Sequence, residues 1–458
     1  MLTHSNLLKC NNLFIIVALL CASLYSFFAY IVVRTDYIKL VGLYAILFGL
    51  FYYSVKHFNN SPKILTYMAF GFRVIFIVAI PNLSQDFFRF IWDGRMILEG
   101  YNPYLYTVQS FFDNGQLPIH QAEALRHGMG DLNASHFTNY PPVNQLCFAV
   151  AALWSSKSIL GSVVIMRLLI ISADFGTLFF GQKLLKQLKM PSYYIFWYIL
   201  NPFIIIELTG NLHFEGVMIF FLVWSLYLLH IRKWYWAAVT LALSISVKLI
   251  PLIFLPLFLQ WFINLYGIKP GIKRLIAFYG LVLLCTLSLF VPFYSSKFVH
   301  NYTQTVALWF QNFEFNASLY YIARELGYKF RGYNEIEIIG KVIPVLVLAV
   351  TLTITFLRNN KTTARLITAM LMVLTLYYFM ATTVHPWYIA TLLILAVFTK
   401  YKFPLVWSGV IILSYLAYLN LNKPDKSENF VIIALEYLLV YGVFIWDIFI
   451  KKAPKTGA

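Results

Sequence analysis

Apolar runs separated by short polar connections make up most of the chain. The runs fall at 12–33, 38–56, 64–82, 142–156, 159–184, 192–209, 212–231, 234–248, 250–266, 273–293, 338–357, 364–383, 386–399, 403–420 and 430–450. A helix that crosses a bilayer needs about 20 mainly apolar residues, and its backbone must satisfy its own hydrogen bonds in lipid. The pattern therefore predicts an all-α polytopic membrane protein with about 13–15 transmembrane helices.

Two long polar interruptions, 83–141 and 294–337, stand out from connections that are otherwise short. The sequence contains no evident internal repeat and no low-complexity linker. We therefore predict a single integral membrane domain. Its parts are an N-terminal helix pair, a candidate catalytic module that carries the first long loop, and C-terminal helices that carry the second, at 1–60, 61–300 and 301–458.

Lysine and arginine residues predict the orientation, because cytoplasmic loops are enriched in them. The run at 142–156 is short and follows Pro141, which favours a re-entrant or surface-lying helix over a full crossing. If the N-terminus is inside and this run does not cross, the main basic clusters also lie inside, at 183–189, 232–233, 269–274 and 358–365. Both long loops then face the non-cytoplasmic side, together with the turns at 210–215, 247–248 and 385–387.

Composition agrees with this assignment. Hydrophobic residues make up 60% of the chain and charged residues only 12%, which excludes an ordinary soluble domain. The net charge of +17 is spread singly or in small groups between apolar runs, so it indicates membrane topology and not nucleic-acid binding. The four cysteines form no CxxC pair and give no support for a zinc site.

The most informative polar stretch follows the third apolar run, where Asp86, Arg89, Asp93 and Arg95 lie among aromatic residues. Acids at a membrane face beside arginines suit chemistry on a lipid-linked phosphate. Asp86 has two interpretations. It is either a catalytic base, with a pKa raised by desolvation, or an interfacial acid paired with Arg89 three residues further along a helix.

Three cations are candidates for binding a donor phosphate. The guanidinium groups of Arg89 and Arg95 match the geometry of phosphate oxygens, although arginines at an interface also extend to the surface without a ligand. Lys248 precedes Leu249-Ile250-Pro251 at the tip of a helical hairpin on the outer side. It is either a point charge for a lipid phosphate or an ordinary loop lysine.

Further outer-side residues are candidates for substrate contact, each with a structural alternative such as a turn or a rigid helix start: Asp93, Tyr140, Asn211, His213, Glu215 and His385. The donor atoms of Asp86, His213, Glu215 and His385 suit Mg²⁺ or Mn²⁺, but no spacing requires a metal, so a metal site stays open.

Inside the apolar runs, Arg167 and Asp174 lie on one helical face and are expected to form a structural ion pair. A polar path through the membrane lined by these two residues and Glu207 would instead favour a transporter.

Several short motifs occur in order: Ser84-Gln85-Asp86, Glu99-Gly100-Tyr101-Asn102-Pro103-Tyr104, Tyr140-Pro141-Pro142, Asn201-Pro202, Gly210-Asn211 and Lys248-Leu249-Ile250-Pro251. In these motifs, over about residues 60–260, the chain resembles the GT-C glycosyltransferases that use polyprenyl-phosphate-linked sugars. The resemblance is greatest to the GPI mannosyltransferase I catalytic subunit and its bacterial relatives. One position departs from that family. Ser84 stands at the first acid of the family's Asp-x-Asp motif. Asp86 keeps the second acid, so the base is retained, but one of the two acids that could share a metal ion is missing.

The resemblance implies a glycosyltransferase that moves a sugar, by resemblance mannose, from a polyprenyl-phosphate donor to a glycan or glycolipid acceptor on the non-cytoplasmic face. Asp86 would be the base of an inverting displacement, and Arg89, Arg95 and Lys248 would neutralise the departing phosphate. The alternatives are a polytopic transporter or lipid-linked glycan flippase, and a non-catalytic scaffold of the same fold. The absence of soluble domains and retention signals favours a bacterial cytoplasmic membrane over the endoplasmic reticulum.

Overall fold

The computed structural model describes residues 4–311, 313–422 and 428–450. Over these residues the chain is helical, and its only β-type pairing is an isolated bridge between Phe315 and Thr383. The α-helices of the first half are α1 (His4–Tyr30), α2 (Tyr37–His57), α3 (Pro62–Ile75), α4 (Asp86–Leu98), α5 (Val108–Asp113), α6 (Ala122–Ser135), α7 (Pro142–Ser155), α8 (Ile159–Gln187), α9 (Phe196–Ile199), α10 (Glu215–His230) and α11 (Trp234–Val247). Those of the second half are α12 (Phe258–Tyr266), α13 (Ile268–Phe290), α14 (Ser296–Gln311), α15 (Leu319–Arg331), α16 (Ile336–Leu357), α17 (Thr363–Met380), α18 (Ile389–Val397), α19 (Phe403–Val410) and α20 (Phe430–Ile445).

Short 3₁₀ and π segments connect or extend these helices: η1 (Ser192–Ile195), η2 (Ile204–Gly210), η3 (Ile250–Leu257), η4 (Val291–Phe293), η5 (Pro386–Tyr388), η6 (Ile411–Asn422) and η7 (Trp446–Ile450).

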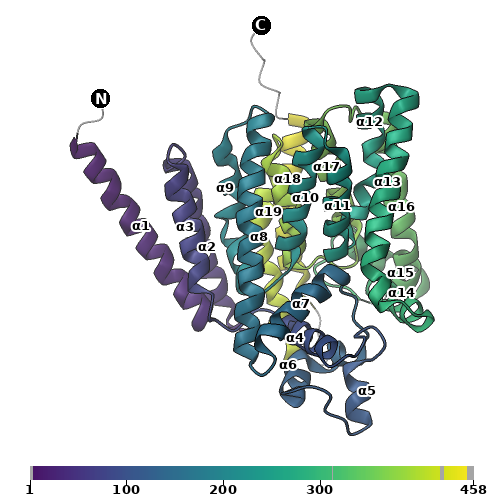
Figure 1. Cartoon of the computed structure of the whole chain (residues 1–458). Helices are drawn as coiled ribbons and strands as arrows, with labels where there is room; N and C mark the ends of the chain where they lie inside the picture. Colours follow the sequence, from purple (N-terminus) through teal and green to yellow (C-terminus); the bar gives the residue numbers. More distant parts are fainter. Residues whose placement is uncertain (1–3, 312, 423–427, 451–458) are drawn as a thin grey trace.

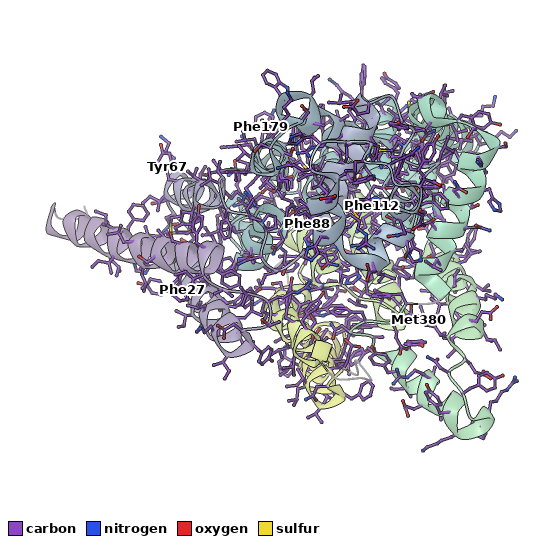
Figure 2. All side chains as sticks on the ribbon, turned by 90° about the horizontal axis from the view of Figure 1, so that it is seen from below. Phe27, Tyr67, Phe88, Phe112, Phe179 and Met380 are labelled. Atoms are coloured by element: carbon purple, nitrogen blue, oxygen red, sulfur yellow. The ribbon has the colours of Figure 1, made fainter. Side chains whose placement is uncertain are left out.

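The long helices run side by side in one bundle, and the short helices α4–α7 gather at one end of it (Figure 1). The beginning of α1 lies toward the opposite end. This arrangement agrees with the predicted topology, in which the start of the first helix and the first long loop lie on opposite sides. Apolar side chains cover the outside of the bundle. Tyr67 and Phe179, for example, are 70% and 52% exposed and project from its rim in Figure 2. Such a surface suits contact with lipid.

The predicted number of crossings is not reproduced. Seven helices in the described part of the chain are long and apolar enough to cross a membrane, or eight if η2 and α10, which meet at an angle of 111°, form one broken span. Four further apolar helices are shorter, at Trp234–Val247, Ile250–Tyr266, Pro386–Val397 and Phe403–Tyr418. Proline and 3₁₀ geometry interrupt several of the apolar runs. The 3₁₀ helix η3, for example, has Pro251 in its first turn and Pro256 in its interior. The all-α polytopic class is confirmed.

The short run at 142–156 forms α7, which has 14 residues and begins at Pro142 after an extended Pro141. At 1.5 Å per residue such a helix is about 21 Å long, short of the ~30 Å hydrocarbon core. It packs against α4 and α8 and lies with α4–α6 at the end of the bundle (Figure 1). This position supports the prediction that the run does not cross.

The expected ion pair between Arg167 and Asp174 is wrong. Asp174 instead accepts a 2.7 Å hydrogen bond from Arg73 on α3, and both side chains are fully buried. Arg167 donates to the backbone carbonyl oxygens of Ile77, Thr209 and Gly210 at 2.8–2.9 Å. Both arginines are therefore structural. They satisfy polar groups where α3 ends and where the π segment η2 leaves carbonyls unpaired.

Candidate active site

A cavity of about 680 Å³ lies where the outer turns meet. Its wall is formed by the start of α4, the segment before α7, the turns before α10 and α18, and the tip between α11 and η3. This confirms that the turns predicted to face outside come together at one place. The sequence-predicted residues that line the cavity are Asp86, Arg89, Tyr140, His213, Glu215, Lys248 and His385.

Asp86 is the first residue of α4, and its backbone N–H donates to Ser84 Oγ at 3.3 Å. Ser84 therefore supports the start of this helix. Burial raises the pKa of the Asp86 carboxyl to about 6, and the negative charge of Glu215 adds to the rise. Lys248, a hydrogen bond from Asn133 and the charge of Arg34 oppose it. A carboxyl with this pKa is mostly ionised at neutral pH and can still accept a proton.

Arg89 does not pair with Asp86, so that alternative is wrong. Its Nε donates to Asp93 Oδ1 at 2.7 Å, one helical turn further along α4. Its Nη1 donates to the carbonyl oxygens of Asn133 and His136, both at 2.9 Å. Arg89 lies in the cavity wall, but these contacts mainly hold the segment after α6 against α4.

Asp93 is fully buried and does not belong to the cavity wall. It accepts a second hydrogen bond, at 3.1 Å, from Gln145 Nε2 on α7. The same nitrogen also donates to Thr138 Oγ1. Asp93 therefore links α4 to α7 beneath the cavity floor, which is a supporting position and not one that touches a substrate.

Arg95 is also absent from the cavity wall. Its Nη1 donates to the carbonyl oxygen of His120 at 2.6 Å and to Gln121 Oε1 at 3.3 Å. The side chain is 2% exposed, and burial lowers the pKa of its guanidinium to about 10. The structure does not bring Arg95 to Asp86, because it points to the opposite side of α4 toward the loop before α6.

Lys248 forms an ion pair with Glu215, the first residue of α10, and its Nζ lies 4.5 Å from the centre of the Tyr388 ring. Asn144 Nδ2 on α7 donates to the carbonyl oxygen of Val247 at 2.8 Å. The hairpin tip is therefore fixed by α7 on one side and by Glu215 on the other. The lysine remains 35% exposed to the cavity.

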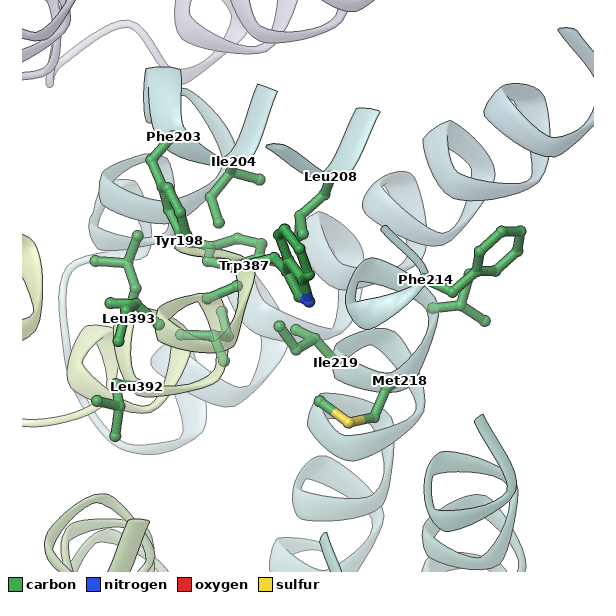
Figure 3. Packing of buried hydrophobic residues seen from close by; sticks show 14 of the residues in the cluster. Tyr198, Phe203, Ile204, Leu208, Phe214, Met218, Ile219, Trp387, Leu392 and Leu393 are labelled. Atoms are coloured by element: carbon green, nitrogen blue, oxygen red, sulfur yellow. The ribbon is translucent and has the colours of Figure 1, made fainter. Parts of the chain in front are cut away.

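The rings of His213 and His385 both stack on the ring of Trp387. The ring centres of His213 and Trp387 are 3.7 Å apart, and those of His385 and Trp387 are 4.6 Å apart. Trp387 is itself held among apolar side chains that include Leu208 and Ile219 (Figure 3). Burial, and then the charge of Lys248, lower the pKa of His385 to about 3, so its ring is neutral at physiological pH. Together the rings form a flat aromatic wall.

Asn211 and Tyr140 position the cavity walls. Asn211 Oδ1 accepts the backbone N–H of Leu83 at 3.1 Å and so fixes the segment that leads to Asp86, without lining the cavity itself. Tyr140 lines the cavity, and its carbonyl oxygen accepts a 2.6 Å hydrogen bond from the hydroxyl of Tyr104. Tyr104 belongs to the Glu-Gly-x-x-Pro-Tyr motif, whose role here is to tie parts of the first long loop together.

A family model described as alpha-(1→6)-mannopyranosyltransferase, N-terminal domain, matches residues 17–264, which is more than half of the chain. The chain belongs to this family. It is therefore a glycosyltransferase, a multi-pass membrane mannosyltransferase of the GT-C type, and neither a transporter nor an inactive scaffold. In agreement, Arg167, Asp174 and Glu207 are not part of the cavity wall. No curated protein matches the chain. The narrower resemblance to the GPI mannosyltransferase I catalytic subunit is not confirmed.

Sequence reasoning missed several residues of the mannosyltransferase cavity, namely Arg34, Glu314, Tyr418 and Glu428. One of them carries a signal that was available in the sequence. Arg34 lies in the short connection between α1 and α2, which the predicted topology places on the outer side, where an arginine is less expected. The others come from the C-terminal part of the chain, beyond the family match.

Two of the four residues considered for a metal, Glu215 and His213, lie against other charged or ionisable side chains. Glu215 pairs with Lys248, and His213 Nε2 lies 3.8 Å from Glu207 Oε2. Within the described ranges, no three histidine, cysteine, aspartate or glutamate side chains are placed to hold a metal ion. The residues present therefore do not form a Mg²⁺ or Mn²⁺ site, and no step below uses one.

Proposed function

We propose that this mannosyltransferase transfers mannose from a polyprenyl-phosphate donor to a hydroxyl group of a glycan or glycolipid, at the non-cytoplasmic face of a bacterial cytoplasmic membrane. The observation that carries this proposal is the position of Asp86. Its carboxylate faces the cavity with a pKa of about 6, and no lysine, arginine or histidine among the described residues lies within 4 Å of it. Such a carboxylate is free to take a proton.

The chemistry is a single displacement. Asp86 removes the proton from the acceptor hydroxyl, whose oxygen attacks C1 of the mannose. The bond from C1 to the phosphate oxygen breaks, its electron pair leaves with the polyprenyl phosphate, and the configuration at C1 is inverted. General-base assistance of this kind contributes about 10²–10⁴-fold to a rate.

Cations near the cavity stabilise the charge that develops on the leaving phosphate. Lys248 supports this role best among the sequence-predicted cations, since it is partly exposed and held from two sides. Arg89 is in the wall but already donates three hydrogen bonds, so we assign it mainly to positioning. Arg95 has no part in phosphate binding in this proposal.

The aromatic wall suits the acceptor. The stacked rings of His213, Trp387 and His385 line the cavity, and a sugar ring can pack against this aromatic group. Asp86 lies in the same cavity as this wall and the Lys248 cation. The cavity therefore holds the elements required for the acceptor, the base and the leaving group.

The donor class is tested by supplying membranes that contain the protein with radiolabelled polyprenyl-phosphate mannose or with nucleotide-linked mannose. We expect label to enter the lipid or glycan fraction only from the polyprenyl donor, and the new linkage to have the opposite anomeric configuration. Transfer from the nucleotide donor alone would contradict the lipid donor. Retention of configuration would contradict the single displacement.

A further inference from the structure

Among the residues that the structure describes, three arginines or lysines line the cavity: Arg34, Arg89 and Lys248. Two of them are already neutralised, Arg89 by Asp93 and Lys248 by Glu215. Arg34 differs, because none of the described carboxylates lies within 4 Å of its guanidinium. Of these three described cations, Arg34 is therefore the one whose charge no neighbouring carboxylate neutralises.

Arg34 is held in place by weak and flexible partners. Its Nη2 donates to Gln85 Oε1 at 3.4 Å, and its guanidinium carbon lies 4.7 Å from the centre of the Tyr418 ring. Gln85 in turn donates from Nε2 to the carbonyl oxygen of Met129 at 2.9 Å. The guanidinium is thus oriented next to the residue that precedes Asp86, with donor groups left for an incoming anion.

The connection that carries Arg34 is fixed to the segment that leads to Asp86. Asn82 Nδ2 donates to the carbonyl oxygens of Phe28 and Val32 at 2.8 and 2.6 Å. These bonds lock the end of α1 beside the start of the first long loop. The connection that carries Arg34 is therefore tied, through the Asn82 side chain, to the segment that leads to Asp86.

The same connection exposes apolar side chains. Ile31, Val33 and Ile38 are 57%, 52% and 85% exposed, so they present a hydrocarbon surface on either side of Arg34 in sequence. A guanidinium fork binds phosphate oxygens well, and apolar side chains in lipid accommodate an isoprenoid chain. The two features together suit an isoprenyl phosphate, whose head is anionic and whose tail is apolar.

We propose that Arg34 is the main ligand of the donor phosphate and that the isoprenoid tail lies along the α1–α2 connection. This inference rests on the proposed polyprenyl-phosphate donor. The donor phosphate is then bound mainly by Arg34, and not by Arg89 or Arg95 as the sequence suggests. Lys248 then assists from its own place in the cavity wall, while Glu215 limits its net charge.

Binding of farnesyl phosphate to the purified full-length protein in detergent tests this inference, with farnesol as the uncharged probe. We expect Arg34→Gln to weaken farnesyl phosphate binding at least tenfold and Arg34→Lys to weaken it less, since lysine keeps the charge but lacks the fork. Lys341→Gln is the matched control. Lys341 is an exposed lysine on α16 that pairs with Glu337 and lies outside both the cavity wall and the α1–α2 connection, so its loss should change nothing. Farnesol should bind all variants alike.

Equal binding of farnesyl phosphate by the wild type and Arg34→Gln would overturn the role of Arg34 and leave the donor class intact. If the wild type bound farnesyl phosphate no better than farnesol, the polyprenyl-phosphate donor itself would be wrong, and this inference with it. Thermal unfolding of each variant shows whether it is folded. If Arg34→Gln does not fold, Arg34→Lys decides, because wild-type affinity in that variant would contradict a guanidinium ligand.

Discussion

Arg89 and Asp93 form a buried ion pair, with Nε and Oδ1 2.7 Å apart and both side chains nearly inaccessible. Asp93 also accepts from Gln145, and Arg89 also holds two backbone carbonyl groups, so this pair joins α4, α7 and the segment between them. The wall of the cavity below Asp86 depends on it. Arg89, which the sequence suggests as a phosphate ligand, thus serves mainly to build the site.

Asp93→Ala should destabilise the protein, because it leaves the Arg89 charge buried without a partner. Breaking a buried ion pair in this way costs about 3–5 kcal/mol. Thermal unfolding in detergent measures the effect as a lower midpoint. Asp131→Ala is the control, since the side chain of Asp131 is 89% exposed, and the account predicts little change there. An unchanged midpoint for Asp93→Ala would contradict a supporting role.

Asn144→Ala should reduce the rate of transfer more than it weakens donor binding. The substitution removes the 2.8 Å hydrogen bond to the carbonyl oxygen of Val247 and loosens the position of Lys248. A bond of this kind contributes about 1 kcal/mol, or roughly fivefold in rate. Kinetics with varied donor concentration separate kcat from KM. Asn114→Ala removes an exposed bond to Ser110 far from the cavity and should leave both unchanged.

Arg95→Met should lower the unfolding midpoint and leave the KM for the donor unchanged. The substitution removes hydrogen bonds to His120 and Gln121 in the loop before α6, and this loop is not part of the cavity wall that Asp86 shares with Lys248. A tenfold rise in KM with an unchanged midpoint would return Arg95 to the phosphate site.

The pH dependence of transfer should follow Asp86. Because the base must be ionised, kcat/KM should fall as pH decreases below about 6 and reach a plateau above it. Initial rates between pH 4.5 and about 8.5 at low donor concentration measure this profile. A rate that stays constant across that range would show that a group other than Asp86 limits the reaction.

The ionisation of Asp86 should also affect the free energy of unfolding, in the opposite direction: stability should fall as pH rises. The folded-state pKa of Asp86 is raised above its ordinary value, so ionising this residue costs stability, and the cost grows as pH rises from about 4 and is complete above about 6. Asp86→Asn should therefore raise the unfolding midpoint at pH 7 and leave it nearly unchanged at pH 4. If the wild type and Asp86→Asn have the same unfolding midpoint at pH 7 as well as at pH 4, the Asp86 carboxylate is not desolvated.

Much of the architecture could be predicted from the chain because it follows from local pattern. Apolar runs predict helices, and the distribution of lysine and arginine predicts that the polar turns share one face. Asp86, Lys248 and His385 therefore meet in one cavity although about 300 residues separate the first from the last. In the described part of the chain fewer helices than the roughly 13–15 predicted are long and apolar enough to cross a membrane, because proline and 3₁₀ segments break several apolar runs into shorter helices.

Side-chain partners could not be predicted in the same way. Arg89 points along its own helix to Asp93 and not back to Asp86, and Asp174 pairs with Arg73, which is 101 residues away in the chain. Both choices depend on how helices pack and on the direction of each side chain. Arg34 reaches the cavity for the same reason, since only the packing of the first helix pair against the start of α4 brings it there.

The central claim is that Asp86 is the base of mannosyl transfer. Its most direct test compares transfer from polyprenyl-phosphate mannose by wild-type protein, Asp86→Asn and Asp131→Asn at equal amounts of folded protein. The account predicts a loss of about 10²–10⁴-fold for Asp86→Asn and wild-type activity for the exposed control. Transfer by Asp86→Asn within a few fold of the wild type would contradict the assignment.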